Sequence, residues 1–199
     1  MTLFQIIMLA ASGYFAFKIY EHIQTLKDVN SDEEASMEDA PRTAEAFSTF
    51  SPESLIQRAD EAFENDDKEK ALALLIEANA KDANNEDTLF KIAYILGEQG
   101  NFDEALEYYN EALEIDEQNE FVHNAMASIY RQKEEYASAK MHLNASLEID
   151  NTNPVTYYNF GNLLVDMHKK EEAIKMYEKA LELQPDFIEV TQELEKLRD

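Results

Sequence analysis

The chain repeats itself every 34 residues, four times in succession and without a gap, in frames that start at Pro52, Glu86, Glu120 and Pro154. Three positions of the frame hold small residues. They are the eighth (Ala59, Ala93, Ala127, Gly161), the twentieth (Ala71, Ala105, Ala139, Ala173) and the twenty-seventh (Ala78, Ala112, Ser146, Ala180). A recurrence of this length predicts a stack of helix pairs, in which small residues let neighbouring helices approach closely.

Larger residues, most of them apolar, recur at the fourth, eleventh and twenty-fourth positions of the frame. Together with the small residues they are spaced three, four or seven residues apart. This spacing is typical of helices with a buried stripe. The residue before each frame has a side-chain oxygen that can accept a hydrogen bond from the free amides of a first helical turn. These predicted caps are Ser51, Asn85, Asn119 and Asn153.

Residues 52–187 resemble the tetratricopeptide repeat (TPR) family. The last frame matches the family pattern best, at Tyr157, Phe160, Gly161, Leu164, Ala173, Tyr177, Ala180 and Pro185. The resemblance implies an all-α, right-handed α-solenoid of four helix pairs (52–85, 86–119, 120–153 and 154–187), with residues 188–199 as a capping helix. Arg58 and Asn79 depart from the pattern, as expected of a terminal repeat.

The charge balance limits the partners of this chain. It has 42 acidic and 17 basic side chains and a formal net charge of −25, so nucleic acid and anionic lipid headgroups would be repelled. The second frame is the most acidic, with ten carboxylates and one basic residue, Lys91. We favour a solvated acidic face there over a site for a basic partner, because most charge runs face water. The absence of cysteine excludes disulfides and cysteine-ligated metals.

The N-terminus carries the second informative feature, an apolar run at residues 3–20. As a helix it would rise about 27 Å, close to a hydrocarbon core of about 30 Å, and the helix would continue to about residue 27. Because no basic residue precedes the run, we favour a transmembrane helix over a cleaved signal peptide. Ser12 and Ala16 form a small-xxx-small pair through which two anchors could associate.

Lys18 and Lys27 lie on the C-terminal flank of this segment and no basic residue lies on its N-terminal flank, so the positive-inside bias predicts cytoplasmic repeats, with a periplasmic or other extracytoplasmic location as the alternative. Residues 28–51 are acidic and poor in large apolar side chains, which predicts a disordered linker between the anchor and the repeats. Phe47 and Phe50, at its end, are expected to fold back on the first repeat.

The sequence offers little that indicates catalysis. It has no Gly-rich phosphate loop, no Gly-x-Ser-x-Gly elbow and no His-Glu-x-x-His pair. The four histidines fall at different repeat positions, and His123 replaces a large core residue, so we expect it to be packed. We therefore expect no enzyme, no cofactor, no metal site and no small-molecule substrate.

The TPR resemblance implies a ligand groove lined by the first helix of each repeat, at its second, fifth, ninth, twelfth and thirteenth positions. The residues selected from these positions are Phe90, Tyr94, Phe121, Asn124, Ser128, Arg131, Tyr158 and Asn162. Aromatic rings, amides and one guanidinium suit a protein or peptide ligand. The alternative is that Phe90, Phe121 and Tyr158 only pack between helices.

The family's clamp for chaperone C-termini needs lysine at the fifth and asparagine at the ninth position of one repeat. These positions hold Ile56 and Asp60, Phe90 and Tyr94, or Asn124 and Ser128, so the clamp is absent. The sequence therefore predicts a membrane-anchored TPR adaptor that assembles a complex at the membrane surface. The alternative is a translocon-associated or periplasmic chaperone that handles unfolded clients.

Overall fold

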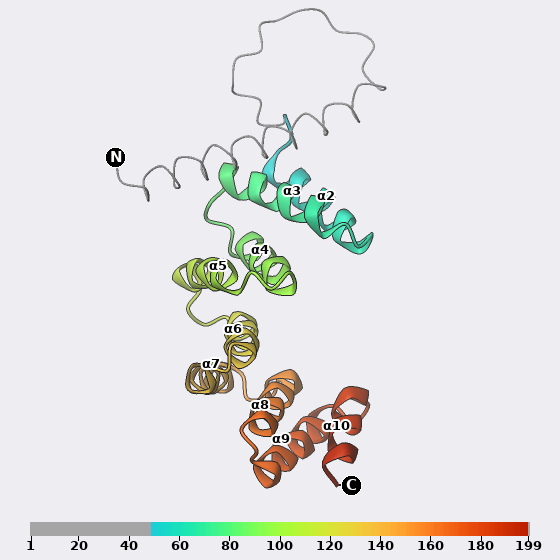
Figure 1. The fold of residues 1–199 in the computed structure, drawn as a ribbon. Helices are drawn as coiled ribbons and strands as arrows, with labels where there is room; N and C mark the ends of the chain where they lie inside the picture. Colours follow the sequence, from blue (N-terminus) through green and yellow to red (C-terminus); the bar gives the residue numbers. More distant parts are fainter. Residues whose placement is uncertain (1–48, 199) are drawn as a thin grey trace, which may run out of the picture. The chain divides into compact units, whose positions relative to one another are not determined.

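The computed structural model describes residues 49–198, which form nine α-helices and no strand (Figure 1). The helices are α2 (Pro52–Glu64), α3 (Lys68–Lys81), α4 (Glu86–Glu98), α5 (Phe102–Ile115), α6 (Glu120–Gln132), α7 (Tyr136–Ile149), α8 (Pro154–Asp166), α9 (Lys170–Leu183) and α10 (Ile188–Arg198). This is an all-helical solenoid of helix pairs, as the resemblance implied. The predicted transmembrane helix at residues 3–20 and most of the predicted linker lie outside the described residues. Within residues 49–198, no helix has the length and apolar character needed to cross a bilayer.

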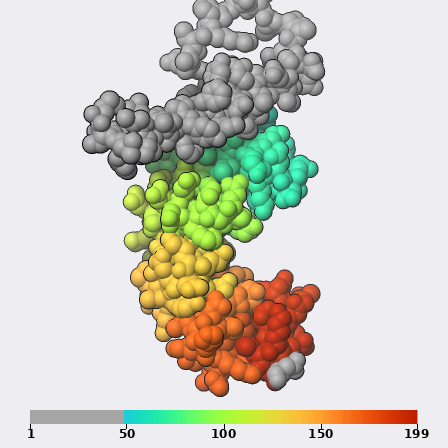
Figure 2. All heavy atoms as spheres, in the orientation of Figure 1, coloured from blue at the N-terminus to red at the C-terminus, as the bar shows by residue number. Residues whose placement is uncertain are grey.

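The helices are arranged in pairs that follow one another along the stack. The even-numbered helices α2, α4, α6 and α8 begin at the first residues of the four sequence frames, and each packs on the odd-numbered helix after it. Each odd-numbered helix then contacts the next pair, and α4 and α8 also contact α6 directly. Successive repeats consequently form consecutive bands of the molecular surface (Figure 2).

The recurring small residues allow this packing. Every eighth, twentieth and twenty-seventh position is buried, and larger side chains such as Leu75, Tyr109 and Leu143 fill the space between them. The approach is close at Gly161, where an added Cβ would lie 2.2 Å from Cε1 of Tyr177. Glycine is therefore required at this point of α8 by space, since its φ is not in the left-handed region.

The four predicted caps are confirmed. Ser51 and Asn85 accept hydrogen bonds from the backbone N–H three residues on, at 3.3 and 2.9 Å, and Asn153 accepts one from Val155 at 2.9 Å. Asn119 accepts two, from the amides of Phe121 and Val122. Each cap satisfies amides that have no partner inside the helix, and so it sets where the first helix of each repeat begins.

The turn inside each repeat uses a left-handed residue at the fifteenth position of the frame. These residues are Asp66 (φ 61°), Gly100 (φ 80°), Glu134 (φ 61°) and His168 (φ 59°). The next residue donates its backbone N–H to a carbonyl five residues back in all four turns, as in a Schellman motif. The backbone conformation therefore repeats although the side chains do not.

The two ends of the described stack differ. At the C-terminal end, α10 buries Val190 and Leu194 against Tyr177 and Ala180. At the N-terminal end, the ring of Phe50 lies 4.3 Å from the guanidinium carbon of Arg58 on α2. The expectation that Phe50 folds back on the first repeat is confirmed, whereas Phe47 lies outside the described residues.

Candidate functional site

The even-numbered helices α4, α6 and α8 carry all eight of the predicted groove residues, and their exposure differs widely. Phe121 and Tyr94 are open to solvent, with 57% and 42% of their surface exposed, and Asn124 is buried. The remaining five are half-buried: Phe90, Ser128, Arg131, Tyr158 and Asn162. Phe90 packs on Tyr109, with ring centroids 5.6 Å apart, so it also serves the interior of its repeat.

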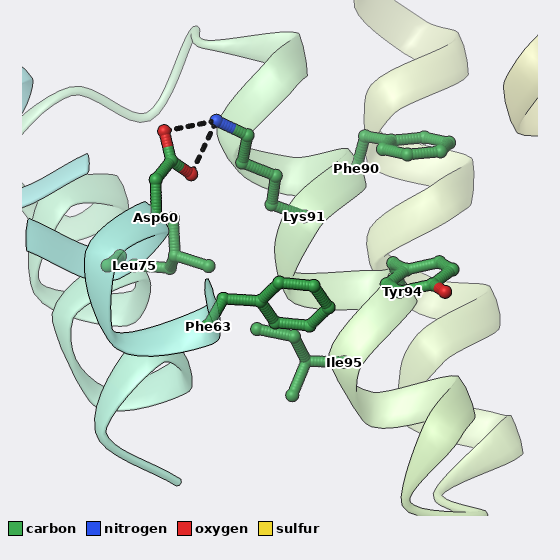
Figure 3. A pocket seen from close by; sticks show the side chains of 8 residues that line it. Asp60, Phe63, Leu75, Phe90, Lys91, Tyr94 and Ile95 are labelled. Atoms are coloured by element: carbon green, nitrogen blue, oxygen red, sulfur yellow. Dashed lines mark hydrogen bonds and ion pairs between the residues drawn. The ribbon is translucent and has the colours of Figure 1, made fainter. Parts of the chain in front are cut away.

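A pocket of about 150 Å³ lies where α2, α3 and α4 meet (Figure 3). Its walls are mostly apolar, with Phe63 from α2, Leu75 from α3, and Phe90, Tyr94 and Ile95 from α4. Phe63 and Tyr94 meet edge to face with ring centroids 6.0 Å apart, and both are exposed. Exposed aromatic rings beside an apolar hollow are typical of surfaces that bind another molecule.

One lysine lies beside this pocket between two carboxylates. Nζ of Lys91 is 2.9 Å from Oδ1 of Asp60 (Figure 3), and it also lies 3.1 Å from Oδ2 of Asp87. Burial alone would lower the pKa of Lys91, but the hydrogen bonds to Asp60 and Asp87 raise it above its ordinary value. Lys91 therefore stays charged and fastens α2 to α4, and it already has two anionic partners.

The predicted groove residues did not include Phe63, Asp60 or Lys91, which help to form the pocket. Phe63 and Asp60 occupy the twelfth and ninth positions of the first frame, whereas all eight predicted groove residues belong to the three later frames. The same positional rule, applied to the first frame, would have found both residues. Lys91 is at the sixth position of its frame, which the rule does not include.

Asn124 occupies the centre of a buried polar network between repeats 3 and 4. Its Nδ2 donates to Oγ of Ser146 at 2.8 Å and to Oγ1 of Thr156 at 2.7 Å. Its Oδ1 accepts from Nδ2 of Asn159 at 3.2 Å. Since an unpaired buried amide costs about 1–3 kcal/mol, this network fastens α6 to α7 and α8. The amide of Asn124 is thus engaged within the protein.

Arg131 is also paired within the protein. Its Nη1 lies 2.7 Å from Oδ2 of Asp166, the last residue of α8, and both side chains are about one third exposed. A carboxylate of a ligand would have to share Arg131 with Asp166. Farther along α8, Asn162 accepts a 2.7 Å hydrogen bond from the hydroxyl of Tyr177, and the ring of Tyr158 lies between those of Tyr177 and Phe187.

His123 and His142 form a pair inside repeat 3, with their Nδ1 atoms 3.0 Å apart. The ring of Tyr130 stacks on His142 at a centroid distance of 5.3 Å. Burial, followed by the nearby His123, lowers the pKa of His142 to about 4, and burial also lowers the pKa of His123. Both rings are therefore neutral near pH 7, as needed for one Nδ1 to donate to the other. Within the described part of the chain, no group of three or more potential ligands could hold a metal ion.

Comparison with known proteins agrees with this geometry. Sequence profiles described as "Tetratricopeptide repeat" match residues 86–119 and 120–186, about half of the chain, in the frames of α4–α5 and α6–α9. The chain belongs to the tetratricopeptide repeat family. No curated protein matches this TPR protein significantly in sequence.

Solved TPR structures resemble it over the helical part. The first TPR of Spaghetti (RPAP3) bound to the HSP90 peptide SRMEEVD is 29% identical, with a TM-score of 0.54, covering 59% of this chain and 93% of that one. MamA 41-end from Desulfovibrio magneticus RS-1 is 18% identical (TM-score 0.64), covering 73% and 82% of the two chains. Pseudomonas aeruginosa pilF is 23% identical (TM-score 0.67), covering 73% and 67%. The last two likenesses concern the fold alone.

Proposed function

We propose that this TPR protein is a membrane-anchored scaffold that holds a protein or peptide partner on its even-numbered helices and assembles a complex at the membrane surface. The observation that carries the proposal is the apolar pocket between α2, α3 and α4, with the exposed rings of Phe63 and Tyr94 at its edge. Exposed aromatic anchors over a pocket are the features from which protein interfaces draw most of their binding energy.

The RPAP3 structure supports a peptide as ligand, since that protein is bound to an HSP90 peptide. The same ligand is not proposed here, because the first-repeat and second-repeat clamp positions hold Ile56, Asp60, Phe90 and Tyr94 instead of lysine and asparagine. Asn124 and Arg131 position neighbouring repeats through their partners on α8, and Phe121, Ser128, Tyr158 and Asn162 extend the contact surface beyond the pocket. No catalytic role is proposed.

The anchor and its orientation rest on the sequence. The apolar run at residues 3–20 would span the bilayer, and Lys18 and Lys27 on its C-terminal flank favour cytoplasmic repeats. Full-length protein should then stay in the membrane fraction under carbonate extraction, and a reporter fused after Asp199 should be active on the cytoplasmic side. A reporter active only outside the cytoplasm would reverse the orientation, and a mature chain beginning near Gly13 would remove the anchor.

Cross-linking of the full-length protein in its native membrane, followed by mild-detergent purification and mass spectrometry, tests the scaffold. One stoichiometric partner is expected, and it should be lost with the double substitution Phe63→Ala/Tyr94→Ala. The matched control is Met141→Ala, which removes a 60% exposed apolar side chain from α7 instead. Loss of the partner with Met141→Ala alone would place the interface on the odd-numbered helices.

The second candidate is a chaperone for unfolded clients, favoured by Phe121 and Val155, which are 57% and 42% exposed at the same position of successive repeats. A chaperone should cross-link to many proteins without fixed stoichiometry and should suppress the aggregation of unrelated unfolded proteins. A scaffold should do neither.

A further inference from the structure

The pocket between α2, α3 and α4 lies in the more acidic half of the solenoid. Repeats 1 and 2, which form it, carry nineteen acidic and five basic side chains, whereas repeats 3 and 4 carry eleven and seven. A ligand that approaches the pocket therefore meets a stronger negative potential than one that approaches the C-terminal half. A cation would be attracted there and an anion repelled.

The charged side chains that follow the pocket residues along α2 and α4 are also acidic. Glu64 lies one helical turn after Asp60 on α2, and Glu98 one turn after Tyr94 on α4, so both carboxylates share a face with pocket residues. Glu98 has Lys68 at 3.4 Å, whereas Glu64 makes no ion pair within residues 49–198. Glu64 and Glu98 are the last residues of α2 and α4, so the negative C-terminal ends of these helix dipoles lie beside the same carboxylates.

The pocket offers no free cation to a ligand. Lys91 is the one basic residue in its walls, as far as the described residues show, and Asp60 and Asp87 already neutralise it. A carboxylate would have to displace one of these two partners. An acidic peptide such as the HSP90 segment SRMEEVD bound by RPAP3 thus has the wrong charge for this pocket.

The walls determine what else the ligand must carry. The lining is largely apolar, and its volume of about 150 Å³ has room for one aromatic or branched aliphatic side chain, since an apolar cavity of about this size takes a benzene ring. Phe63 and Tyr94 present ring faces and edges at the opening, where a lysine or arginine side chain is also attracted.

We propose that this pocket binds a short basic segment of a protein partner, with one aromatic or branched aliphatic side chain against Phe63 and Tyr94 and with lysine or arginine beside Glu64, whose carboxylate makes no ion pair within residues 49–198. This inference rests on the proposed function and specifies the partner's chemistry. It differs from the solvated-face interpretation of the acidic charge because Asp60 lines an apolar pocket, and Glu64 and Glu98 lie on the same helix faces as other lining residues.

The test is a selection of peptides from a random phage-displayed library on the full-length protein in detergent, with the binding of each selected peptide then measured by fluorescence anisotropy. The selected peptides should be rich in lysine and arginine around one aromatic or branched aliphatic residue. Their affinity should fall as salt is raised to about 0.3 M, where the Debye length is only a few ångströms. Phe63→Ala/Tyr94→Ala should raise Kd roughly tenfold or more.

A charge-reversed pair of variants isolates the electrostatic part. Glu64→Lys should raise Kd roughly fivefold, and the cation suits the last turn of α2, so the fold should be retained. Glu107→Lys makes the same change of net charge at an exposed position of α5 and should leave Kd within about twofold. Equal effects of the two variants would mean that only net charge matters, and the pocket would not be the basic site.

The outcomes separate this inference from the proposed function. Neutral or acidic peptides that lose binding with Phe63→Ala/Tyr94→Ala would overturn the basic partner and leave the scaffold standing. Peptides that bind Phe63→Ala/Tyr94→Ala and Phe121→Ala/Tyr158→Ala as tightly as they bind the wild-type protein would overturn both the basic partner and the scaffold. A library that yields no binder to the wild-type protein would also overturn both, since neither a basic nor any other peptide would then bind these helices.

Discussion

Gly161 on α8 and Tyr177 on α9 are packed so closely that a Cβ on Gly161 would lie 2.2 Å from Cε1 of the tyrosine ring. The hydroxyl of Tyr177 donates a 2.7 Å hydrogen bond to Oδ1 of Asn162, which holds the ring across the glycine. Repeats 1 and 3 use alanine with leucine at the two equivalent positions, Ala59 with Leu75 and Ala127 with Leu143. Repeat 2 has alanine with tyrosine there, Ala93 with Tyr109, so the glycine of repeat 4 goes with the position in which Asn162 holds the Tyr177 ring and not with tyrosine alone.

Gly161→Ala should therefore destabilise the solenoid by on the order of 1–3 kcal/mol, because the ring must move and its hydrogen bond weakens. Gly97→Ala on α4 is the matched control. There the nearest atom to an added Cβ is Cδ1 of Ile129 at 3.5 Å, an ordinary contact, so alanine should add up to about 1 kcal/mol through helix propensity. Urea unfolding measures both. Equal free energies of unfolding for the two variants would contradict this account of the packing.

The two buried threonines at the third position of their frames should respond in opposite ways to substitution by valine. Thr156 accepts from Asn124 and contacts the hydroxyl of Ser146 at 3.1 Å, whereas Oγ1 of Thr88 is buried with no hydrogen-bond partner among the described residues. Thr156→Val should cost about 1–3 kcal/mol, because it leaves buried groups unpaired. Thr88→Val should be neutral or stabilising, and thermal unfolding of the two variants decides the point.

The histidine pair predicts a pH dependence of stability. The pKa of His142 is lowered from 6.5 to about 4 in the folded protein, so the unfolded chain binds the proton more tightly. The stability that the neutral ring provides is present above about pH 6.5 and is lost as the pH falls toward 4. Between pH 7 and pH 5 the loss should be on the order of 1–2 kcal/mol.

His142→Phe keeps an aromatic ring stacked on Tyr130 and removes the titration, so its unfolding free energy should change less between these pH values than that of the wild type. His168→Gln, at an exposed position, should leave the wild-type pH dependence intact. If His142→Phe shows the full wild-type loss, protonation of His142 is not the cause.

The left-handed position of the intra-repeat turns offers a further test. Glu134 has φ of 61°, a conformation that costs a residue with a Cβ about 1 kcal/mol, so Glu134→Gly should raise the melting temperature. Gly100→Ala, at φ of 80°, should lower the melting temperature, because it costs a similar free energy of unfolding. Opposite signs in thermal unfolding are expected, and a destabilising Glu134→Gly would mean that the turn tolerates its glutamate without strain.

Because Arg131 pairs with Asp166, substitution of Arg131 should affect stability as well as binding. Arg131→Glu would place a carboxylate next to Asp166, so it should lower stability by about 1 kcal/mol as well as weaken binding of a partner that shares Arg131. The exchange Arg131→Asp/Asp166→Arg should restore most of the stability. Lys140→Glu, at an exposed position on α7, is the control for net charge, and an equal loss of stability there would exclude a role for the pair.

The helical repeat, its frames, its buried small residues and the caps at Ser51, Asn85, Asn119 and Asn153 could be predicted from the sequence, because each depends on residues within a few turns of one another. The left-handed position of the turn inside each repeat could not be predicted from the sequence, because the residues there share a backbone conformation but no side-chain chemistry. They are Asp66, Gly100, Glu134 and His168.

Which of the predicted groove residues are free to contact a ligand depends on the packing of the repeats. Lys91 meets Asp60 from 31 residues away, Asn124 meets Thr156 from 32, and Arg131 meets Asp166 from 35. Partners about one frame apart are brought together by the stacking of neighbouring repeats, and the periodic pattern specifies that repeats stack without specifying which polar groups then come within hydrogen-bonding distance. The pocket beside Phe63 and Tyr94 arises in the same way, because helices of two repeats must pack before its walls exist.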